Sequence, residues 1–158
     1  MKKWQDFINE VIKKHDTVAR VICFKEEAKF LTIKRSMEED TSQGYWDLPG
    51  GHIDEEDDSI EMGVIRELKE ETNLESSIKD LVYIGKTENS EADSYFYATD
   101  SWSGSIKFNK NPKTGIIEHT DTKWVTIDEL KNNKTFELRT FPTYLLDKAI
   151  EKLKISKT

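Results

Sequence analysis

Hydrophobic residues in the middle of the chain recur every three or four positions, as they do on one face of an α-helix. This stripe consists of Ile60, Val64, Ile65 and Leu68. Its spacing predicts a helix over residues 59–72. Asp58 or Ser59 is suited to cap the start, because a short polar side chain can accept a hydrogen bond from the first turn. Asn73 can adopt the left-handed conformation that ends a helix.

Short runs rich in β-branched and aromatic residues lie on both sides of this helix and predict strands. The predicted strands cover 18–25, 30–35, 45–48, 81–86, 95–99, 106–108 and 123–126. Residues 26–29 suit a hairpin turn, and Pro49-Gly50-Gly51 breaks the chain sharply. A short helical turn is expected at 127–130.

Further helices are expected at both ends of the chain. Within residues 1–15, apolar residues that include Trp4 and Phe7 recur at helical spacing from about residue 3 to 14. A last helix is predicted over 141–154, with Pro142 in its first turn. Strands around a central helix, with helices at the ends, predict an α/β/α sandwich with a mixed β-sheet. No repeat or linker interrupts the pattern, so residues 1–158 are expected to form one domain.

Charge and composition exclude several classes of protein. The 158 residues include 31 acidic and 24 basic ones, for a net charge of −7, so general binding to nucleic-acid backbones is not expected. No apolar run approaches the ~18 residues that a membrane span needs, and charged residues come too early for a signal peptide. Cys23 is the only cysteine, which excludes an internal disulfide and fits a reducing cytoplasm.

The central helix carries three carboxylates that call for a positive partner. Glu67, Glu70 and Glu71 stand at i, i+3 and i+4, so they project within a sector of about 100° and repel one another. A solvated acidic face is one interpretation. However, Glu71 borders the apolar stripe, where a carboxylate would be partly buried and would need a partner. A hard cation such as Mg²⁺ takes oxygen ligands, and the preceding Gly50-Gly51 lets a backbone carbonyl approach it closely.

The stretch from residue 50 to 74 resembles the Nudix box, G-x5-E-x7-R-E-U-x-E-E-x-G-U, where U is bulky and apolar. The match runs through Gly51-His52-Ile53-Asp54-Glu55-Glu56-Asp57-Asp58 and, seven residues later, Arg66-Glu67-Leu68-Lys69-Glu70-Glu71-Thr72-Asn73-Leu74. Asp58 is taken as the counterpart of the first Glu, with one extra residue between Gly51 and Asp58, and Asn73 replaces the last Gly. The order of elements over residues 17–154 also resembles the Nudix sandwich.

This resemblance implies a MutT-like pyrophosphohydrolase that depends on Mg²⁺, or on Mn²⁺. It would cleave a phosphoanhydride bond in a nucleoside diphosphate linked to another moiety, with nucleoside triphosphates as the first candidates. The alternative is a catalytically weak Nudix-fold sensor that binds a nucleotide. The carboxylates at 67, 70 and 71 are intact, which favours the enzyme.

The resemblance also implies roles for individual residues. The implied metal ligands are the Gly50 carbonyl, Glu67, Glu70, Glu71 and Glu118. Glu118 lies where many members of the family place a further acidic ligand. Glu67 is the candidate general base or an additional ligand, and Arg66 is expected to orient Glu67 or Asp58. Glu118 or His119 is an alternative base, although His119 and His52 also fit polar loop positions.

The substrate side of the site is less defined by sequence. Arg35, Tyr45 and Trp46 flank the Gly-rich loop, where an aromatic ring could stack on a nucleobase and Arg could reach phosphate. The alternative role for the two aromatic residues is core packing. The expected partner is a small-molecule nucleotide. The N-terminal helix could cover its own sheet or that of a second copy, so a homodimer is an open expectation.

Overall fold

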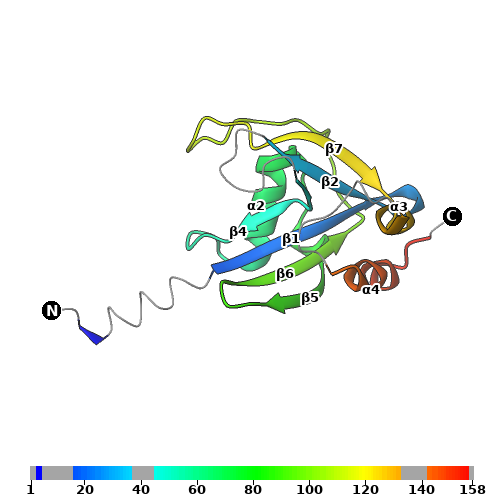
Figure 1. Cartoon of the computed structure of the whole chain (residues 1–158), viewed down its shortest axis with the longest axis horizontal. Coiled ribbons are helices and arrows are strands. Elements are labelled where there is room, and N and C mark those ends of the chain that lie inside the picture. The colour runs from blue at the N-terminus through cyan, green and yellow to red at the C-terminus, as the bar shows by residue number, and fades with distance from the viewer. Residues whose placement is uncertain (1–2, 5–15, 37–44, 133–141, 157–158) are drawn as a thin grey trace.

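The computed structural model describes residues 3–4, 16–36, 45–132 and 142–156 (Figure 1). The helix predicted within residues 1–15 lies almost entirely outside the described residues, as does the first residue of the predicted 141–154 helix. Among the residues that are described, no helix has the length and apolar character needed to cross a membrane.

A seven-stranded mixed sheet forms the centre of the structure. Its strands are β1 (Asp16–Lys25), β2 (Lys29–Arg35), β3 (Trp46–Asp47), β4 (Gly50–His52), β5 (Val82–Glu88), β6 (Ala92–Thr99) and β7 (His119–Val125). The main order is β3-β2-β1-β6-β5, with β4 paired to β1 and β7 paired to β2. The β1–β6 pair is parallel and the other pairs are antiparallel, so the prediction of a mixed sheet is confirmed.

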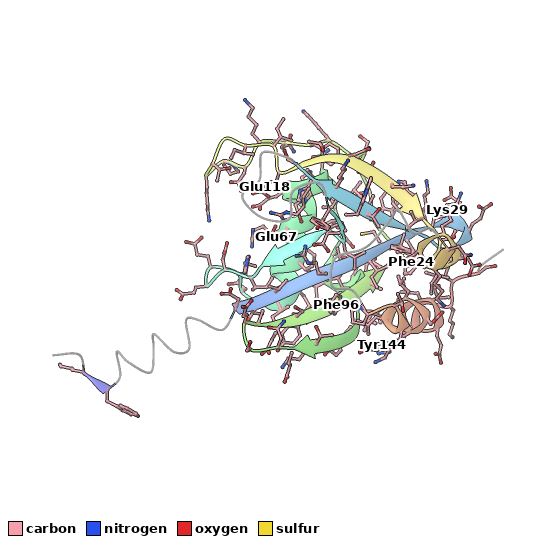
Figure 2. The ribbon with its side chains drawn as sticks, in the orientation of Figure 1. Phe24, Lys29, Glu67, Phe96, Glu118 and Tyr144 are labelled. Atoms are coloured by element: carbon pink, nitrogen blue, oxygen red, sulfur yellow. The ribbon has the colours of Figure 1, made fainter. Side chains whose placement is uncertain are left out.

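Side chains that alternate along β1 supply both hydrophobic cores. One core joins Ala19, Val21 and Cys23 to α2 (Ile60–Thr72), through Val64 and Leu68. The core on the opposite face contains Ile22 and Phe24 and packs against α4 (Tyr144–Leu153) and α3 (Ile127–Asn132). In Figure 2, Phe24 and Phe96 lie on the α4 side and Glu67 lies by α2. The α/β/α arrangement is therefore confirmed.

The ends of α2 are set by the residues expected from sequence. Ser59 Oγ accepts a hydrogen bond from the Met62 N–H at 3.1 Å, which caps the first turn. Asn73 has φ 70° and donates its N–H to the Lys69 carbonyl, so it ends the helix in the left-handed conformation. From this position α2 brings Glu71 into contact with Gly50 of β4 and His119 of β7.

Two short 3₁₀ helices connect parts of the sheet. The first, Glu26–Ala28, joins β1 to β2 and occupies the predicted hairpin turn. The second, Ile78–Asp80, precedes β5.

The strand predicted at 106–108 is wrong. The segment runs beside the C-terminal end of α2, where the Lys107 N–H donates to the Thr72 carbonyl at 2.9 Å and Asn73 Nδ2 donates to the Ser105 carbonyl. The last carbonyls of a helix lack partners within the helix, so a neighbouring chain segment can satisfy them. The last strand also begins earlier than expected, at His119 instead of residue 123.

Candidate active site and metal centre

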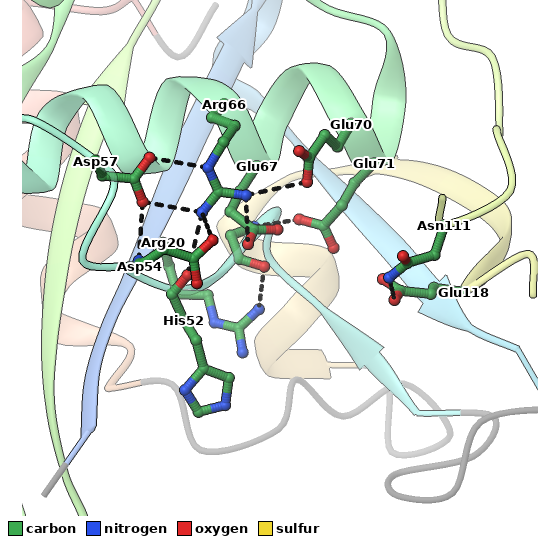
Figure 3. Close-up of polar contacts among 11 residues, drawn as sticks. Arg20, His52, Asp54, Asp57, Arg66, Glu67, Glu70, Glu71, Asn111 and Glu118 are labelled. Atoms are coloured by element: carbon green, nitrogen blue, oxygen red, sulfur yellow. Dashed lines mark hydrogen bonds and ion pairs between the residues drawn. The ribbon is translucent and has the colours of Figure 1, made fainter. Parts of the chain in front are cut away.

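The three glutamates of α2 span a gradient from solvent to the interior (Figure 3). The Glu70 side chain is 49% exposed, the Glu67 side chain 17% and the Glu71 side chain only 5%. All three lie in the last two turns of α2, where the helix dipole is unfavourable to negative charge. This arrangement leaves a strongly negative face that a cation would neutralise.

Gly50 connects the sheet to the most buried of these carboxylates. Its N–H donates to Glu71 Oε1 at 2.7 Å. The residue has φ +144°, and a Cβ here would collide with the Ala19 carbonyl oxygen, so only Gly fits. The Gly50 carbonyl accepts a hydrogen bond from Arg20 Nη1 at 3.2 Å. A cation bound to that oxygen would therefore share it with Arg20 or displace the guanidinium.

The side chain of Arg66, a residue of α2, contacts several carboxylates at once. Its Nε and Nη2 donate to Asp57 Oδ1 and Oδ2 at 2.9 and 3.0 Å. Its Nη1 donates to Glu70 at 3.1 Å and to Glu67 at 3.3 Å. The expected contact with Glu67 is thus present, and Arg66 fixes the positions of two glutamates.

The expected pairing of Arg66 with Asp58 is not found, because Asp57 occupies that place and Asp58 is exposed. Five residues lie between Gly51 and Asp57, so the start of the box has the usual spacing if Asp57 is the counterpart of the first Glu. The extra residue lies between Asp57 and Arg66 instead of before Asp58. Ser59, which lies in this interval, caps the helix.

Two consecutive residues from the later part of the chain complete the cluster. His119, at the start of β7, is only 3% exposed, and its Nε2 lies 3.2 Å from Glu71 Oε2. Glu118 accepts a short hydrogen bond from Asn111 Nδ2. Ligand atoms of Glu71, Glu118 and His119 lie within 4.8 Å of one another. Residues far apart in the sequence therefore converge on one point at the end of α2.

Burial and mutual repulsion shift the acidity of these groups. Burial raises the pKa of Glu67 to about 7, with the charges of Glu70 and Glu118 adding to the effect and Arg66 opposing it. The pKa of Glu71 is raised well above its usual value by burial and by Glu67. Burial, with help from Arg35 and Arg20, lowers the pKa of His119 to about 3, so its imidazole is neutral. The pKa of Asp57 is lowered by its hydrogen bonds from Arg66.

The donor set fits a divalent cation. Carboxylate oxygens are the ligands that Mg²⁺ and Mn²⁺ prefer. Burial and mutual repulsion raise the pKa values of Glu67 and Glu71, and a cation bound beside them would favour their ionised forms. The residues that would hold the metal are Glu67, Glu70, Glu71 and Glu118, with the Gly50 carbonyl close to Glu71.

Two cavities lie on opposite sides of β4. The first, about 240 Å³, separates the end of α2 from the 108–112 loop and contains the carboxylate cluster. It is lined by Lys69, Glu70, Glu71, Asn73, Phe108, Asn109, Lys110, Asn111, Pro112, Glu118 and His119. The second, about 460 Å³, lies on the α4 face of the sheet, and its lining includes Arg20, Asp47, His52, Asn89, Ser94 and Phe96. Because Arg20 also contacts the Gly50 carbonyl, the second cavity adjoins the carboxylate cluster across β4.

The predicted substrate residues are Arg35, Tyr45 and Trp46. Among the residues that the structure describes, the linings of the two cavities do not include these three. Arg35 pairs with His119 in the sheet, and its charge influences that imidazole. Tyr45 is 55% exposed and uses its carbonyl to accept the Arg35 N–H. Trp46 packs against the core on the α4 side, which is the alternative role considered for it.

The sequence did not predict the positions of three residues of the site. Arg20 was overlooked, although a lone Arg within the apolar run of β1 is itself a signal. Asp57 could have been found by counting from Gly51. His119 was expected to be a polar loop residue or an alternative base, and no local pattern around it indicates burial against Glu71.

Comparisons with known proteins agree with this geometry. A family model described as the NUDIX domain matches residues 13–145. A curated MutT-like protein of Streptomyces ambofaciens is 28% identical over 120 residues, which are 73% of this chain and 67% of that protein. The chain belongs to the Nudix family, so the predicted family and its general class, a Nudix hydrolase, are confirmed.

Solved structures share the fold at low sequence identity. A MutT protein from Methanosarcina mazei Go1 has a TM-score of 0.66 at 22% identity, with 89% of this chain and 96% of that chain covered. The NUDIX domain of Shewanella oneidensis NrtR, solved in complex with ADP ribose, has a TM-score of 0.67 at 21% identity, with 97% and 99% covered.

Proposed function

We propose that this protein is a Mg²⁺-dependent pyrophosphohydrolase that cleaves a phosphoanhydride bond in a nucleotide. The observation that carries the proposal is the convergence of Glu70, Glu71 and Glu118 around one cavity, with Glu67 close enough to feel the charges of Glu70 and Glu118. Such a face repels a diphosphate unless a cation lies between them. Bound Mg²⁺ would supply that neutralisation and lower the pKa of a coordinated water.

The residues of this chain would then divide the remaining work. Glu70, Glu71, Glu118 and the Gly50 carbonyl would hold the metal. Glu67, partly buried and close to Glu70 and Glu118, would accept a proton from the attacking water. The water oxygen would bond to phosphorus, the bridging P–O bond would break, and the leaving phosphate would depart with the electron pair of that bond. Arg66 would keep Glu67 and Glu70 in position.

The cavity on the other side of β4 supports a nucleotide as the substrate. Its volume of about 460 Å³ is in the range of small-molecule sites. Arg20 offers a cation close to the Gly50–His52 strand, Asp47 and Asn89 offer polar contacts, and Phe96 offers an aromatic surface. A nucleoside held there would direct its diphosphate across β4 toward the glutamates. Nucleoside triphosphates are the first candidates, and ADP-ribose is next because the related NrtR domain was solved with it.

The remaining expectations of the sequence stay part of this proposal. Arg35, whose charge acts on His119, is the candidate to bind a phosphate, and exposed Tyr45 could stack on a base. Packing of Trp46 against the core makes it the weakest of the three candidates. We retain the cytoplasm as the compartment on the basis of the single cysteine, Cys23, which is buried. A homodimer remains open.

The proposal is tested by incubating the purified protein with nucleoside triphosphates, ADP-ribose, nucleotide sugars and dinucleoside polyphosphates. Each reaction is run with Mg²⁺ and with chelator, and the products are separated by chromatography. Glu70→Gln and Glu71→Gln keep the side-chain shape while they remove a ligand charge. Glu61→Gln, on the first turn of the same helix and hydrogen-bonded to Tyr97, is the matched control.

Mg²⁺-dependent release of a nucleoside monophosphate, lost in both ligand variants and kept in Glu61→Gln, would support the proposal and name the substrate class. Nucleotide binding without product from any substrate would favour the sensor. Product that forms equally well with chelator would contradict the metal-dependent mechanism.

A further inference from the structure

His119 reaches the carboxylate cluster through an irregularity in the sheet. Along β2 and β7, Lys34 pairs with Asp121 and Arg35 pairs with His119, so Thr120 is an extra residue on β7. This is a β-bulge, which reverses the alternation of side chains beyond it. Trp124 faces the core beneath α2, and regular alternation from Trp124 would direct Thr120, not His119, to that face.

The bulge therefore places the buried imidazole of His119 at a position that the Thr120 side chain would otherwise occupy. Thr120 is exposed, whereas His119 is buried against Glu71. Burying a polar ring costs free energy unless the ring has a partner. Bulges often lie beside functional sites because they redirect one side chain, and this one directs His119 toward the cluster.

The distances suit a shared ion. Two adjacent ligands of an octahedral ion with bonds of about 2.1 Å lie about 3 Å apart. The 3.2 Å separation of His119 Nε2 and Glu71 Oε2 matches that spacing. The third group, Glu118, has a carboxylate oxygen within 4.8 Å of both, so the three ligand atoms are close enough to share one ion. Glu118 directly precedes His119 in the chain, so the backbone would hold the two side chains close together.

We propose that His119 Nε2 is a metal ligand beside Glu71 and Glu118. The centre is then a mixed nitrogen and oxygen site that discriminates against Mg²⁺ in favour of Co²⁺, Fe²⁺ and Zn²⁺ more strongly than a site made of oxygen alone. Imidazole is a better ligand for these ions than for Mg²⁺. The inference rests on the metal centre of the proposed function and not on the identity of its substrate.

The competing role for His119 is to orient Glu71 through a hydrogen bond without contacting the ion. The two roles differ in their consequences. A neutral imidazole bound through Nε2 carries its proton on Nδ1, whereas an orienting imidazole donates from Nε2 to Glu71. His119→Gln separates them, because its amide N–H can still donate to Glu71 but the side chain no longer offers an imidazole nitrogen.

Pulsed EPR of the full chain loaded with Mn²⁺ detects a nitrogen bonded directly to the ion. The sample carries no histidine tag and is kept in a buffer without amine ligands. We expect nitrogen coupling in the wild type and in His52→Gln, whose parent side chain is 69% exposed. We expect the coupling to be lost in His119→Gln. Calorimetric titrations should show Co²⁺ affinity reduced by at least about tenfold in His119→Gln, as loss of even an outer partner of a ligand does, with a smaller change for Mg²⁺.

Several results would overturn the inference. Mn²⁺ bound to the wild type without nitrogen coupling would do so, and this measurement needs no variant that must fold. Coupling that persists in His119→Gln, or an equal fall in Co²⁺ and Mg²⁺ affinity, would assign His119 to the orienting role. Failure of every ion to bind would contradict the proposed function as well, so the two failures are distinguishable.

Discussion

Asp57 accepts two parallel hydrogen bonds from Arg66, at 2.9 and 3.0 Å, and so anchors the guanidinium that also contacts Glu67 and Glu70. The loop before α2 and the metal-facing side of the helix are joined through this one cation. Arg66 offers five donors in a rigid fork, which allows it to bind several carboxylates at once. The position of the glutamates therefore depends on an acidic residue that is not itself a predicted ligand.

Replacing Asp57 with Asn should weaken both folding and activity. The substitution removes a charge-assisted pair whose carboxylate is 8% exposed, so we expect a loss of about 1–3 kcal/mol in the free energy of unfolding. Freed from Asp57, Arg66 would pair more closely with Glu67 and Glu70 and compete with the metal, which raises the Mg²⁺ concentration needed for activity. Urea denaturation and a Mg²⁺ titration of the rate measure the two effects.

Asp58→Asn is the matched control for this prediction, because Asp58 is adjacent and exposed. It should change stability by less than about 0.5 kcal/mol. Equal effects of the two substitutions would contradict the assignment of Asp57 as the anchor.

The two glycines of β4 should respond differently to alanine. Gly50→Ala forces a Cβ against the Ala19 carbonyl at a positive φ, so the variant should be destabilised by about 2 kcal/mol or more and lose activity. In Gly51→Ala the atoms nearest to the new Cβ belong to the Glu67 carboxyl group, at 3.1 Å. That flexible end can shift, so the fold should remain stable while the displaced Glu67 slows the reaction. Thermal denaturation and kcat separate the two outcomes, and similar melting temperatures for both variants would count against this explanation.

Metal-free protein should lose stability as the pH rises toward neutral. Burial raises the pKa of Glu67 from 4.5, the value for a fully solvated side chain, to about 7 in the folded protein. The folded state then holds a proton that the unfolded state releases, so stability is greatest below about pH 4.5 and falls as the pH rises through about 7. Glu67→Gln should remove the part of this dependence that comes from Glu67, leaving the part that comes from Glu71, and at pH 8 with chelator it should be about 1–3 kcal/mol more stable than the wild type.

Urea denaturation at a series of pH values measures the effect. Glu56→Gln, on the exposed loop before α2, is the control and should follow the wild-type profile. A stability curve in which Glu67→Gln falls as steeply as the wild type between pH 5 and pH 8 would rule out Glu67 as the cause.

Binding of Mg²⁺ should release protons. The cation favours the ionised forms of Glu67 and Glu71, whose pKa values are raised in its absence. Mg²⁺ affinity should therefore increase with pH through about 7, where Glu67 ionises, by at most about tenfold per pH unit for each proton released. Calorimetry in two buffers of different ionisation enthalpy counts the protons. Glu71→Gln should bind Mg²⁺ weakly with fewer protons released, and affinity that does not vary with pH would contradict the prediction.

The local features of α2 could be predicted because each depends on residues close in the chain. Ser59 and Asn73 act on the turns next to them, and the spacing of 67, 70 and 71 places the glutamates on one face whatever the rest of the fold does. The layer order was predictable for a related reason. Hydrophobic patterns of strand and helix leave few ways to cover both faces of a mixed sheet.

Predictions failed where a distant contact outweighed the local pattern. Residues 106–108 have a strand-like composition. However, the Lys107 N–H donates to a carbonyl at the end of α2 and not to the edge of a sheet. Asp58 was expected as a partner of Arg66 beside Glu67, because the extra residue was placed too early, and only the Glu67 contact is present. The loop geometry, which brings Asp57 and not Asp58 against the guanidinium, decided that contact.

The sequence by itself determined the family, the helix of glutamates and the general chemistry, because that information lies in one continuous stretch of about 25 residues. Only the tertiary structure decided which other groups meet those glutamates. Arg20 reaches Gly50 because β1 pairs with β4, and His119 reaches Glu71 because a bulge on β7 reverses its side chain. Strand pairing and register bring together residues far apart in the chain, and a shift of one residue changes which side chain faces the site.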